Sequence, residues 1–206
     1  MKNIRTVIFA KAPQAGFAKT RLIPVLGADG AAILARRMLN HAVEQAVQAD
    51  IGTIELSMTP IDDAAWKDVT IPDGVICTDQ GEGDLGARLA RVTERVTANG
   101  EAVILTGTDC PALESGRLRE IATLLAQKDA VMIPTADGGY AAFGLNQFHP
   151  TLFTDINWGT DSVAHETLFR AARLGLAVHM LPMLRDIDES EDLKWLPANW
   201  PEFRYA

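Results

Sequence analysis

The chain has 206 residues, of which 48% are hydrophobic and 22% are charged, a composition typical of one globular domain and not of disordered, collagen-like or disulfide-scaffold proteins. Its formal net charge of −8 argues against binding to a nucleic-acid backbone. No apolar run approaches the ~20 residues that span a bilayer, so we expect a cytoplasmic protein without a membrane span, whose Cys77 and Cys110 are free thiols.

Short continuous apolar runs alternate along the chain with segments of helical periodicity. The runs predict strands over residues 6–10, 51–58, 75–77, 102–105, 130–133, 140–145 and 177–181. The periodic segments predict helices over residues 30–49, 85–96, 118–125, 161–174 and 191–196. Thr160 or Asp161 is the expected N-cap of the fourth helix. This alternation predicts an α/β fold, a three-layer sandwich around a mostly parallel, Rossmann-like sheet.

The loop after the first strand is rich in small residues and carries two cations, Lys19 and Arg21. Residues 1–28 contain five basic and no acidic residues, whereas the other 178 residues have a net charge of −13. Backbone N–H groups near Gly16 and the two cations suit a phosphate chain, unless these cations are merely solvated. Because Ala18 stands where a P-loop has glycine, a P-loop NTPase is disfavoured.

Acidic residues follow a central strand and recur near the C-terminus. Asp109 ends the strand over 102–105 and is either a ligand for Mg²⁺ or the N-cap of the next helix. Asp186 and Asp188 would point to the same side of an extended segment, so one of them could complete a metal site. The alternative is that Asp188 or Ser190 caps the short helix over 191–196.

A glycine-rich turn lies between the strand over 75–77 and the following helix. Its glycines allow close approach of a ligand, and the Gln80 amide offers both a donor and an acceptor to a base edge. An ordinary turn in which Asp84 caps the helix explains the same residues equally well. Ligands of such sheets bind beyond the carboxyl ends of strands. The loops over residues 11–21, 79–84 and 107–111 all begin at such ends and are therefore candidates for one site.

Six motifs in these segments occur in one order and span nearly the whole chain. They occupy residues 9–22, 80–88, 107–111, 137–140, 158–161 and 186–193. Together they resemble a family of small bacterial proteins, the glycosyltransferase-A-like or nucleotide-diphospho-sugar transferase-like family. More distantly, the layout is similar to guanylyltransferases that make molybdenum and deazaflavin cofactors. The resemblance implies the nucleotide-diphospho-sugar transferase fold over residues 1–206, with a nucleotide-binding half at 1–110 and an acceptor-binding half at 111–206.

The resemblance also implies roles for individual residues. Lys19, Arg21 and Asp109 would be catalytic. The nucleotide would contact Ala10, Lys11, Gly16, Lys19, Arg21, Gln80, Gly81, Asp84 and Arg88. The acceptor pocket would be lined by Asp137, Gly138, Gly139, Tyr140, Trp158, Gly159, Thr160 and Asp161. Mg²⁺, with Mn²⁺ as the alternative, would be held by Asp109 and by Asp188 or Asp186.

Two chemistries remain open for a nucleotide or nucleotide sugar and a small acceptor. The cationic loop slightly favours nucleotidylyl transfer from an NTP to a phosphorylated or hydroxyl acceptor, because Lys19, Arg21 and Mg²⁺ offset more charge than a nucleotide sugar carries. The alternative is glycosyl transfer from a nucleotide-diphospho-sugar, with Asp137 or Asp161 as general base. A third interpretation is a nucleotide-binding module without catalysis.

The C-terminal segment contains four aromatic residues, Trp195, Trp200, Phe203 and Tyr205. We expect them to pack as a strap on the body of the protein. The alternative is a homodimer contact, because exposed aromatic residues are common at interfaces.

Overall fold

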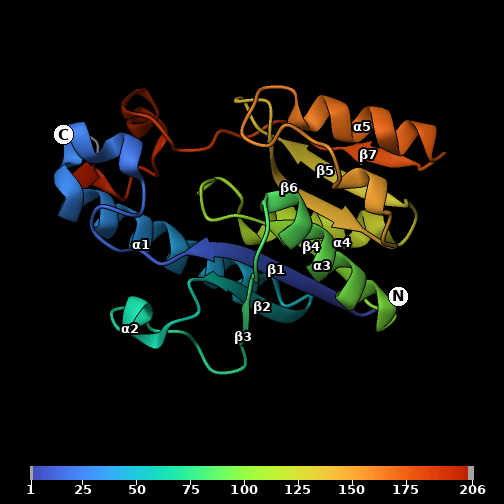
Figure 1. Cartoon of the computed structure of the whole chain (residues 1–206), viewed down its shortest axis with the longest axis horizontal. Helices are drawn as coiled ribbons and strands as arrows, with labels where there is room; N and C mark the ends of the chain where they lie inside the picture. The colour runs from blue at the N-terminus through green and yellow to red at the C-terminus, as the bar shows by residue number, and fades with distance from the viewer. Residues whose placement is uncertain (1, 204–206) are drawn as a thin grey trace.

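A seven-stranded sheet runs through the computed structural model, which describes residues 2–203 (Figure 1). Its strands are β1 (Ile4–Lys11), β2 (Gly52–Thr59), β3 (Ile76–Asp79), β4 (Ala102–Thr106), β5 (Ala130–Pro134), β6 (Tyr140–Leu145) and β7 (Val178–Met180). The strand order is β3-β2-β1-β4-β6-β5-β7. β6 is antiparallel to β4 and β5, and the other neighbouring pairs are parallel. The expected mostly parallel sheet is therefore confirmed.

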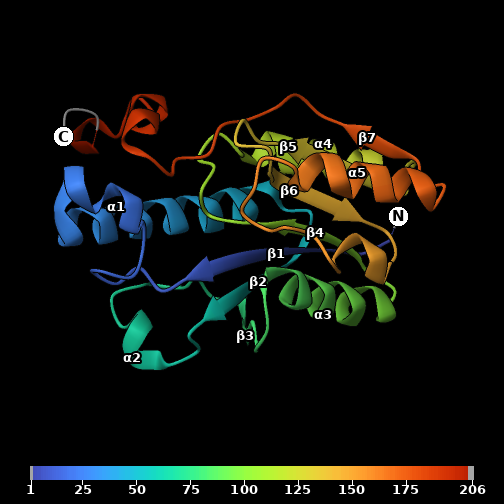
Figure 2. The same cartoon turned by 45° about the horizontal axis from the view of Figure 1, so that its top comes forward.

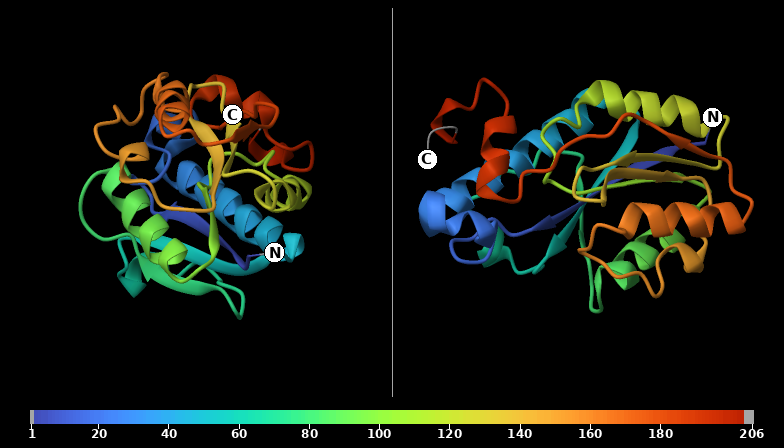
Figure 3. Two further views of the ribbon diagram at one scale, coloured as in Figure 1. Left: turned by 90° about the vertical axis from the view of Figure 1, so that its right-hand side faces the viewer. Right: turned by 90° about the horizontal axis from the view of Figure 1, so that it is seen from above.

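Helices cover both faces of this sheet (Figure 3). The α-helices are α1 (Ile23–Ala49), α2 (Asp63–Trp66), α3 (Leu85–Ala98), α4 (Ser115–Leu125) and α5 (Val163–Arg173). Single 3₁₀ turns or short 3₁₀ helices are η1 (Thr20–Leu22), η2 (Pro150–Leu152), η3 (Ser190–Trp195) and η4 (Pro201–Phe203). Buried side chains of α4 and of α1 from Leu39 onward pack in one core cluster, and those of α3 and α5 pack in a second. The architecture is the expected three-layer sandwich.

The continuous apolar runs of the central strands follow from this layering. Successive side chains of a strand point to opposite faces of the sheet. In β1, Ile8 therefore joins the cluster under α1 and α4, whereas Val7 joins the cluster under α3 and α5. In β4, Ile104 and Leu105 divide in the same way. Since helices cover both faces of the sheet, these strands do not show the regular alternation of apolar and polar residues that is typical of half-exposed strands.

The order of the strands determines which loops lie together at one edge of the sheet. β1 lies between β2 and β4 (Figure 2). The chain continues from β1 to β2 and β3 on one side and then crosses to β4 on the other side of β1. β1 and β4 are parallel, so the loops that follow them leave from the same edge. Open α/β sheets bind ligands at such a reversal of strand order. The loop with Lys19 and the loop with Asp109 both begin there.

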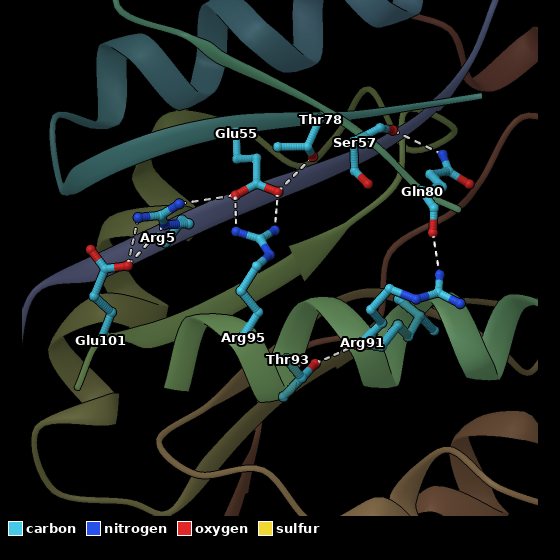
Figure 4. Close-up of polar contacts among 10 residues, drawn as sticks. Arg5, Glu55, Ser57, Thr78, Gln80, Arg91, Thr93, Arg95 and Glu101 are labelled. Carbon is cyan, nitrogen blue, oxygen red and sulfur yellow. Dashed lines mark hydrogen bonds and ion pairs between the residues drawn. The ribbon is translucent and has the colours of Figure 1, made fainter. Parts of the chain in front are cut away.

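A buried carboxylate lies in the sheet itself. Glu55 of β2 is 0% exposed and accepts hydrogen bonds from Arg5 of β1, Arg95 of α3 and Thr78 of β3 (Figure 4). Arg5 is also held by Glu101 at 2.8 Å. Burial alone would raise the pKa of Glu55, but the hydrogen bonds from Arg95, Thr78 and Arg5 outweigh it and lower the pKa. The cluster ties three strands to α3.

The C-terminal segment packs against the first part of α1. Trp200 and Phe203 are buried there against Leu34 and Met38, so the expected strap is confirmed for these two residues. Trp195 is instead 50% exposed. Tyr205 lies outside the described residues. None of the helices within residues 2–203 is long and apolar enough to cross a membrane.

The structure corrects the expected start of one helix and the expected N-cap of another. α1 begins at Ile23 and not at residue 30, although Gly27 (φ 70°, ψ 167°) interrupts its first part. The N-cap of α5 is Ser162 rather than Thr160 or Asp161, because the Thr160 hydroxyl donates to the Asn157 carbonyl.

Two acidic residues with proposed capping roles do not cap helices. α4 follows Glu114, so Asp109 is not its N-cap. The N-cap of η3 is Glu189, whose backbone N–H donates to the Asp192 carboxylate. Neither Asp188 nor Ser190 has this role, since the Asp188 carboxylate accepts from Lys19.

Candidate active site

The ammonium of Lys19 joins three segments of the chain. It lies 2.7 Å from Asp109 Oδ1 and donates to Asp188 Oδ1 at 2.8 Å and to the Ile187 carbonyl at 2.6 Å. An ammonium has three N–H donors, so all three are used within the protein. Burial alone would lower the pKa of Lys19, but the carboxylates of Asp109 and Asp188 outweigh it and raise the pKa. The Lys19 side chain, 7% exposed, is therefore a charged group within the protein.

The backbone of Lys19 is strained. Its φ of 48° and ψ of 44° lie in the left-handed region, which costs roughly 1–2 kcal/mol for a residue with a Cβ. The turn before it depends on Gly16 (φ 81°) and is closed by the Gln14 carbonyl, which accepts from the N–H groups of Phe17 and Ala18. Backbone strain of this kind collects at functional sites, and here it accompanies the burial of the Lys19 ammonium.

The C-terminal segment brings Asp188 to this point. The N–H of Ile187 donates to the Asp109 carbonyl at 2.8 Å, and the Ile187 side chain is buried under α1. Arg21 lies 3.9 Å from Asp188 Oδ2 and is 67% exposed. Asp186 makes no ion pair with a described residue; burial, together with nearby Asp137 and Asp188, raises its pKa to about 6.

Two adjacent cavities share the carboxylates of Asp109 and Asp188, which we call the acidic pair. The loop cavity has a volume of about 460 Å³ and is lined by Phe9, Ala10, Lys11, Phe17, Ala18, Lys19, Thr20, Arg21, Ala35, Thr59, Gln80, Thr108, Asp109, Asp137, Gly159 and Asp188. The aromatic cavity has a volume of about 260 Å³ and is lined chiefly by apolar side chains, with Tyr140 and Trp158 among them. Asp109, Asp137 and Asp188 line both cavities. Groups bound in the two cavities would therefore both lie beside these carboxylates.

The structure brings many of the sequence-predicted residues to these cavities. Of the expected nucleotide residues, the loop cavity is lined by Ala10, Lys11, Lys19, Arg21 and Gln80 but not by Gly16, Gly81, Asp84 or Arg88. Of the expected acceptor residues, the aromatic cavity is lined by Asp137, Gly139, Tyr140, Trp158, Gly159 and Thr160 but not by Gly138 or Asp161. Asp186 lines the aromatic cavity and not the loop cavity.

Gln80 is buried, and its amide is bonded to the protein. Its Nε2 donates to the Ser57 carbonyl at 2.8 Å (Figure 4). The same nitrogen donates to the Ala10 carbonyl at 3.1 Å, and Oε1 accepts from Arg88 at 3.1 Å. These bonds tie the ends of β1 and β2 to α3. Asp84 accepts from the Ala87 N–H at 2.8 Å, which confirms it as the N-cap of α3.

Two glycines outside the cavities allow close packing around them. A Cβ on Gly138 (φ 90°) would lie 2.1 Å from the Asp161 carbonyl oxygen, and one on Gly86 would lie 2.5 Å from Trp158 Nε1. Sequence reasoning missed Thr59 and Thr135, which line the loop and aromatic cavities, respectively. Both lie at or just beyond the end of a strand, so the rule that ligands bind at carboxyl ends could have identified them.

The acidic pair fits a hard divalent cation. Within residues 2–203, no group of three His, Cys, Asp or Glu side chains is placed to hold a metal ion, but Mg²⁺ is commonly held by one or two carboxylates together with substrate phosphates. Asp109 and Asp188 are 51% and 37% exposed, and only Oδ1 of each bonds to Lys19. Asp109 Oδ2, and Asp188 Oδ2 at 3.9 Å from the Arg21 guanidinium, leave oxygen ligands for such an ion.

The family model described as "uncharacterized protein conserved in bacteria" (DUF2064) matches residues 39–160. The chain belongs to this family. A candidate nucleotide-diphospho-sugar transferase from Desulfovibrio desulfuricans G20 is 28% identical, with a TM-score of 0.88 over 100% of this chain and 92% of that one. No curated protein matches the chain.

Two more distant structures share the fold. Rv0371c of Mycobacterium tuberculosis, in complex with manganese, is 21% identical, with a TM-score of 0.52 over 90% of this chain and 92% of that one. The 4-diphosphocytidyl-2C-methyl-D-erythritol synthase of Anaerococcus prevotii is 13% identical, with a TM-score of 0.64 over 97% and 99%. This chain therefore has the nucleotide-diphospho-sugar transferase fold, as the sequence motifs indicated.

Proposed function

We propose that this DUF2064 protein is a metal-dependent transferase that moves a group from a nucleotide to a hydroxyl acceptor. The observation that carries the proposal is the acidic pair, Asp109 and Asp188. The two carboxylates line both cavities and are joined by the Lys19 ammonium. This arrangement suits a phosphate chain on one side and an acceptor on the other. That Rv0371c, which shares the fold, forms a complex with manganese supports the inclusion of a divalent ion in the proposal.

The charges of the loop cavity favour glycosyl transfer over nucleotidylyl transfer. Lys11, Lys19 and Arg21 line it, but so do Asp109, Asp137 and Asp188. Because these charges cancel, a divalent ion leaves only a modest positive surplus. That surplus suits a nucleoside-diphosphate sugar better than the more highly charged NTP. The slight preference from sequence for an NTP counted the cations and not the carboxylates beside them.

The aromatic cavity suits an acceptor without a phosphate group. Four carboxylates line it, those of Asp109, Asp137, Asp186 and Asp188. None of the described residues in its wall is basic. A phosphorylated acceptor would meet unfavourable charge there, so we assign this cavity to a hydroxyl compound with an apolar portion.

Asp137 is the general base in this proposal. It lines both cavities, whereas Asp161 lines neither. Its Oδ1 accepts from the Thr135 hydroxyl at 2.5 Å and from the Gly139 N–H at 3.0 Å, which orients the carboxylate and leaves Oδ2 for the acceptor. The acceptor oxygen attacks the anomeric carbon, the bond from that carbon to the diphosphate oxygen breaks, and the hydroxyl proton passes to Asp137.

The departing diphosphate carries new negative charge, which Lys11 and Arg21 at the loop cavity would stabilise. A divalent ion held by Asp109 and Asp188 would supply further positive charge to the same oxygens. Lys19 keeps the two carboxylates together. Nucleotidylyl transfer is the second candidate, because Lys11 and the exposed Arg21 line the loop cavity without being buried between carboxylates as Lys19 is.

Calorimetric titration tests these alternatives. NTPs and nucleotide sugars are titrated with and without Mg²⁺ or Mn²⁺, into the wild type and Asp109→Asn. Metal-dependent binding that prefers the nucleotide sugar is expected, and Asp109→Asn should abolish the metal dependence. A preference for NTP would establish the second candidate. Binding that ignores the metal would instead indicate a non-catalytic nucleotide-binding module and overturn the proposal.

A further inference from the structure

Phe17 is a large apolar side chain exposed at the loop cavity. It is 63% exposed, although the neighbouring Ala18 is buried. It lines the same cavity as Lys19 and Arg21, which follow it in the chain. A single exposed apolar residue is common on protein surfaces, so its meaning depends on what holds it there and what it faces.

The backbone, rather than a hydrophobic contact, holds Phe17 at this position. Its N–H donates to the Gln14 carbonyl at 3.1 Å, as does that of Ala18, and Gly16 at φ 81° completes the turn. Among the residues that the structure describes, Phe17 stacks on no other ring and carries no cation over its face. Phe169, which is 57% exposed, instead has the Arg173 guanidinium 5.9 Å from its ring centroid.

We infer that Phe17 is the stacking platform for the base of the nucleotide whose phosphates bind beside Lys11 and Arg21. This inference rests on the proposed function. A nucleotide presents a polyanionic chain and a planar aromatic base separated by a ribose, and the loop cavity presents cations and a free aromatic face on one short loop. Stacking on Phe or Tyr is worth enough to hold a base without any hydrogen bond to its edge.

The hydrogen bonds of the Gln80 amide support stacking as the main contact to the base. Both N–H groups of its amide donate to backbone carbonyls, and its oxygen accepts from Arg88. The side chain that sequence reasoning assigned to the base edge is thus already engaged. Because every base has a π face, the protein should discriminate weakly among nucleobases.

Matched phenylalanine variants test the inference. Phe17→Ala, Phe17→Trp and the control Phe169→Ala are titrated calorimetrically with UDP-glucose, GDP-mannose, UTP, GTP and inorganic tripolyphosphate in the presence of Mn²⁺. Phe17→Ala should weaken the binding of each nucleotide that the wild type binds by about 5- to 150-fold. It should leave tripolyphosphate binding unchanged, because that probe has no base. Phe17→Trp should retain nucleotide affinity, and Phe169→Ala should behave as the wild type.

The outcomes separate the two proposals. Equal weakening of nucleotide and tripolyphosphate by Phe17→Ala would mean that the variant disturbs the loop, and it would overturn stacking while leaving the phosphate site intact as a proposal. No weakening by Phe17→Ala would overturn stacking as well. Failure of the wild type to bind any nucleotide or tripolyphosphate would overturn the proposed function itself. A change in oligomeric state in Phe17→Ala alone, with nucleotide affinity kept, would assign Phe17 to a subunit contact.

Discussion

The Lys19 ammonium donates to Asp188 Oδ1 across 2.8 Å, although 169 positions separate the two residues in sequence. This bond joins the loop after β1 to the segment before η3. Asp109, which follows β4, binds the same nitrogen at 2.7 Å. One cation therefore holds together three of the segments that form the candidate active site.

Replacing Lys19 should separate stability from metal binding. Lys19→Met removes hydrogen bonds to two charged partners and is expected to cost about 1–3 kcal/mol, or a fall in Tm of roughly 2–12 °C. Mn²⁺ should raise the Tm of this variant by more than that of the wild type, since the ion replaces the lost positive charge between the carboxylates. Thermal unfolding with Mn²⁺ or with EDTA measures this, and Lys11→Met, in the same cavity, is the control. Equal stabilisation of all three proteins by Mn²⁺ would contradict the prediction.

We propose Asp188 rather than Asp186 as the second metal ligand, because Asp188 shares the Lys19 ammonium with Asp109. Asp188→Asn should lower the affinity for Mn²⁺ by about tenfold or more, since even the outer partners of metal ligands are worth that much. Asp186→Asn should leave the affinity for Mn²⁺ nearly unchanged. Calorimetric titration with Mn²⁺ alone compares the two, and the opposite ranking would transfer the role to Asp186.

The Glu55 cluster makes the free energy of unfolding depend on pH in the acidic range. Because the folded-state pKa of Glu55 is lowered, its contribution is complete above the unfolded value of about 4.3 and is lost as the pH falls through the folded value. Glu55→Gln removes the buried carboxylate that Arg5 and Arg95 share, although Arg5 keeps Glu101, and it should cost about 3 kcal/mol at pH 7. Urea unfolding from pH 7 to pH 3 should give a flatter stability curve for this variant than for the wild type.

Glu120→Gln is the control for that series, since the exposed pair of Glu120 and Arg117 should contribute less than about 1 kcal/mol. Parallel curves for the wild type and Glu55→Gln would refute the role of the cluster.

Gly138 and Gly159 form a matched pair near the aromatic cavity, because both have positive φ. A Cβ at Gly138 would lie 2.1 Å from the Asp161 carbonyl oxygen, whereas one at Gly159 would meet nothing within 4 Å. Gly138→Ala should therefore destabilise by about 3 kcal/mol or more, and Gly159→Ala by only about 1–2 kcal/mol of backbone strain. Urea unfolding compares them, and equal losses would argue against the close approach at Gly138.

Much of the fold could be predicted from sequence. Residues 102–105 form an apolar run because both faces of β4 are covered, and the helical spacing near Leu89 and Val92 reflects one buried face of α3. Such periodicities are local, since they record how each element is buried. The position of Lys19 and Asp109 at strand ends likewise followed from the strands and the rule for parallel sheets.

Other features depended on contacts between distant segments. No local pattern indicated that Lys19 would use all three donors within the protein, that Gln80 would bond to Ala10 and Ser57, or that Glu55 would be buried with Arg5 and Arg95. These contacts depend on strand order and on the path of the C-terminal segment past β4. The sequence by itself determined which elements form and which loops carry charge, because the hydrophobic pattern and the charge of a segment depend only on its own residues. Only the tertiary structure decided which charges meet, because that depends on how the elements pack in space.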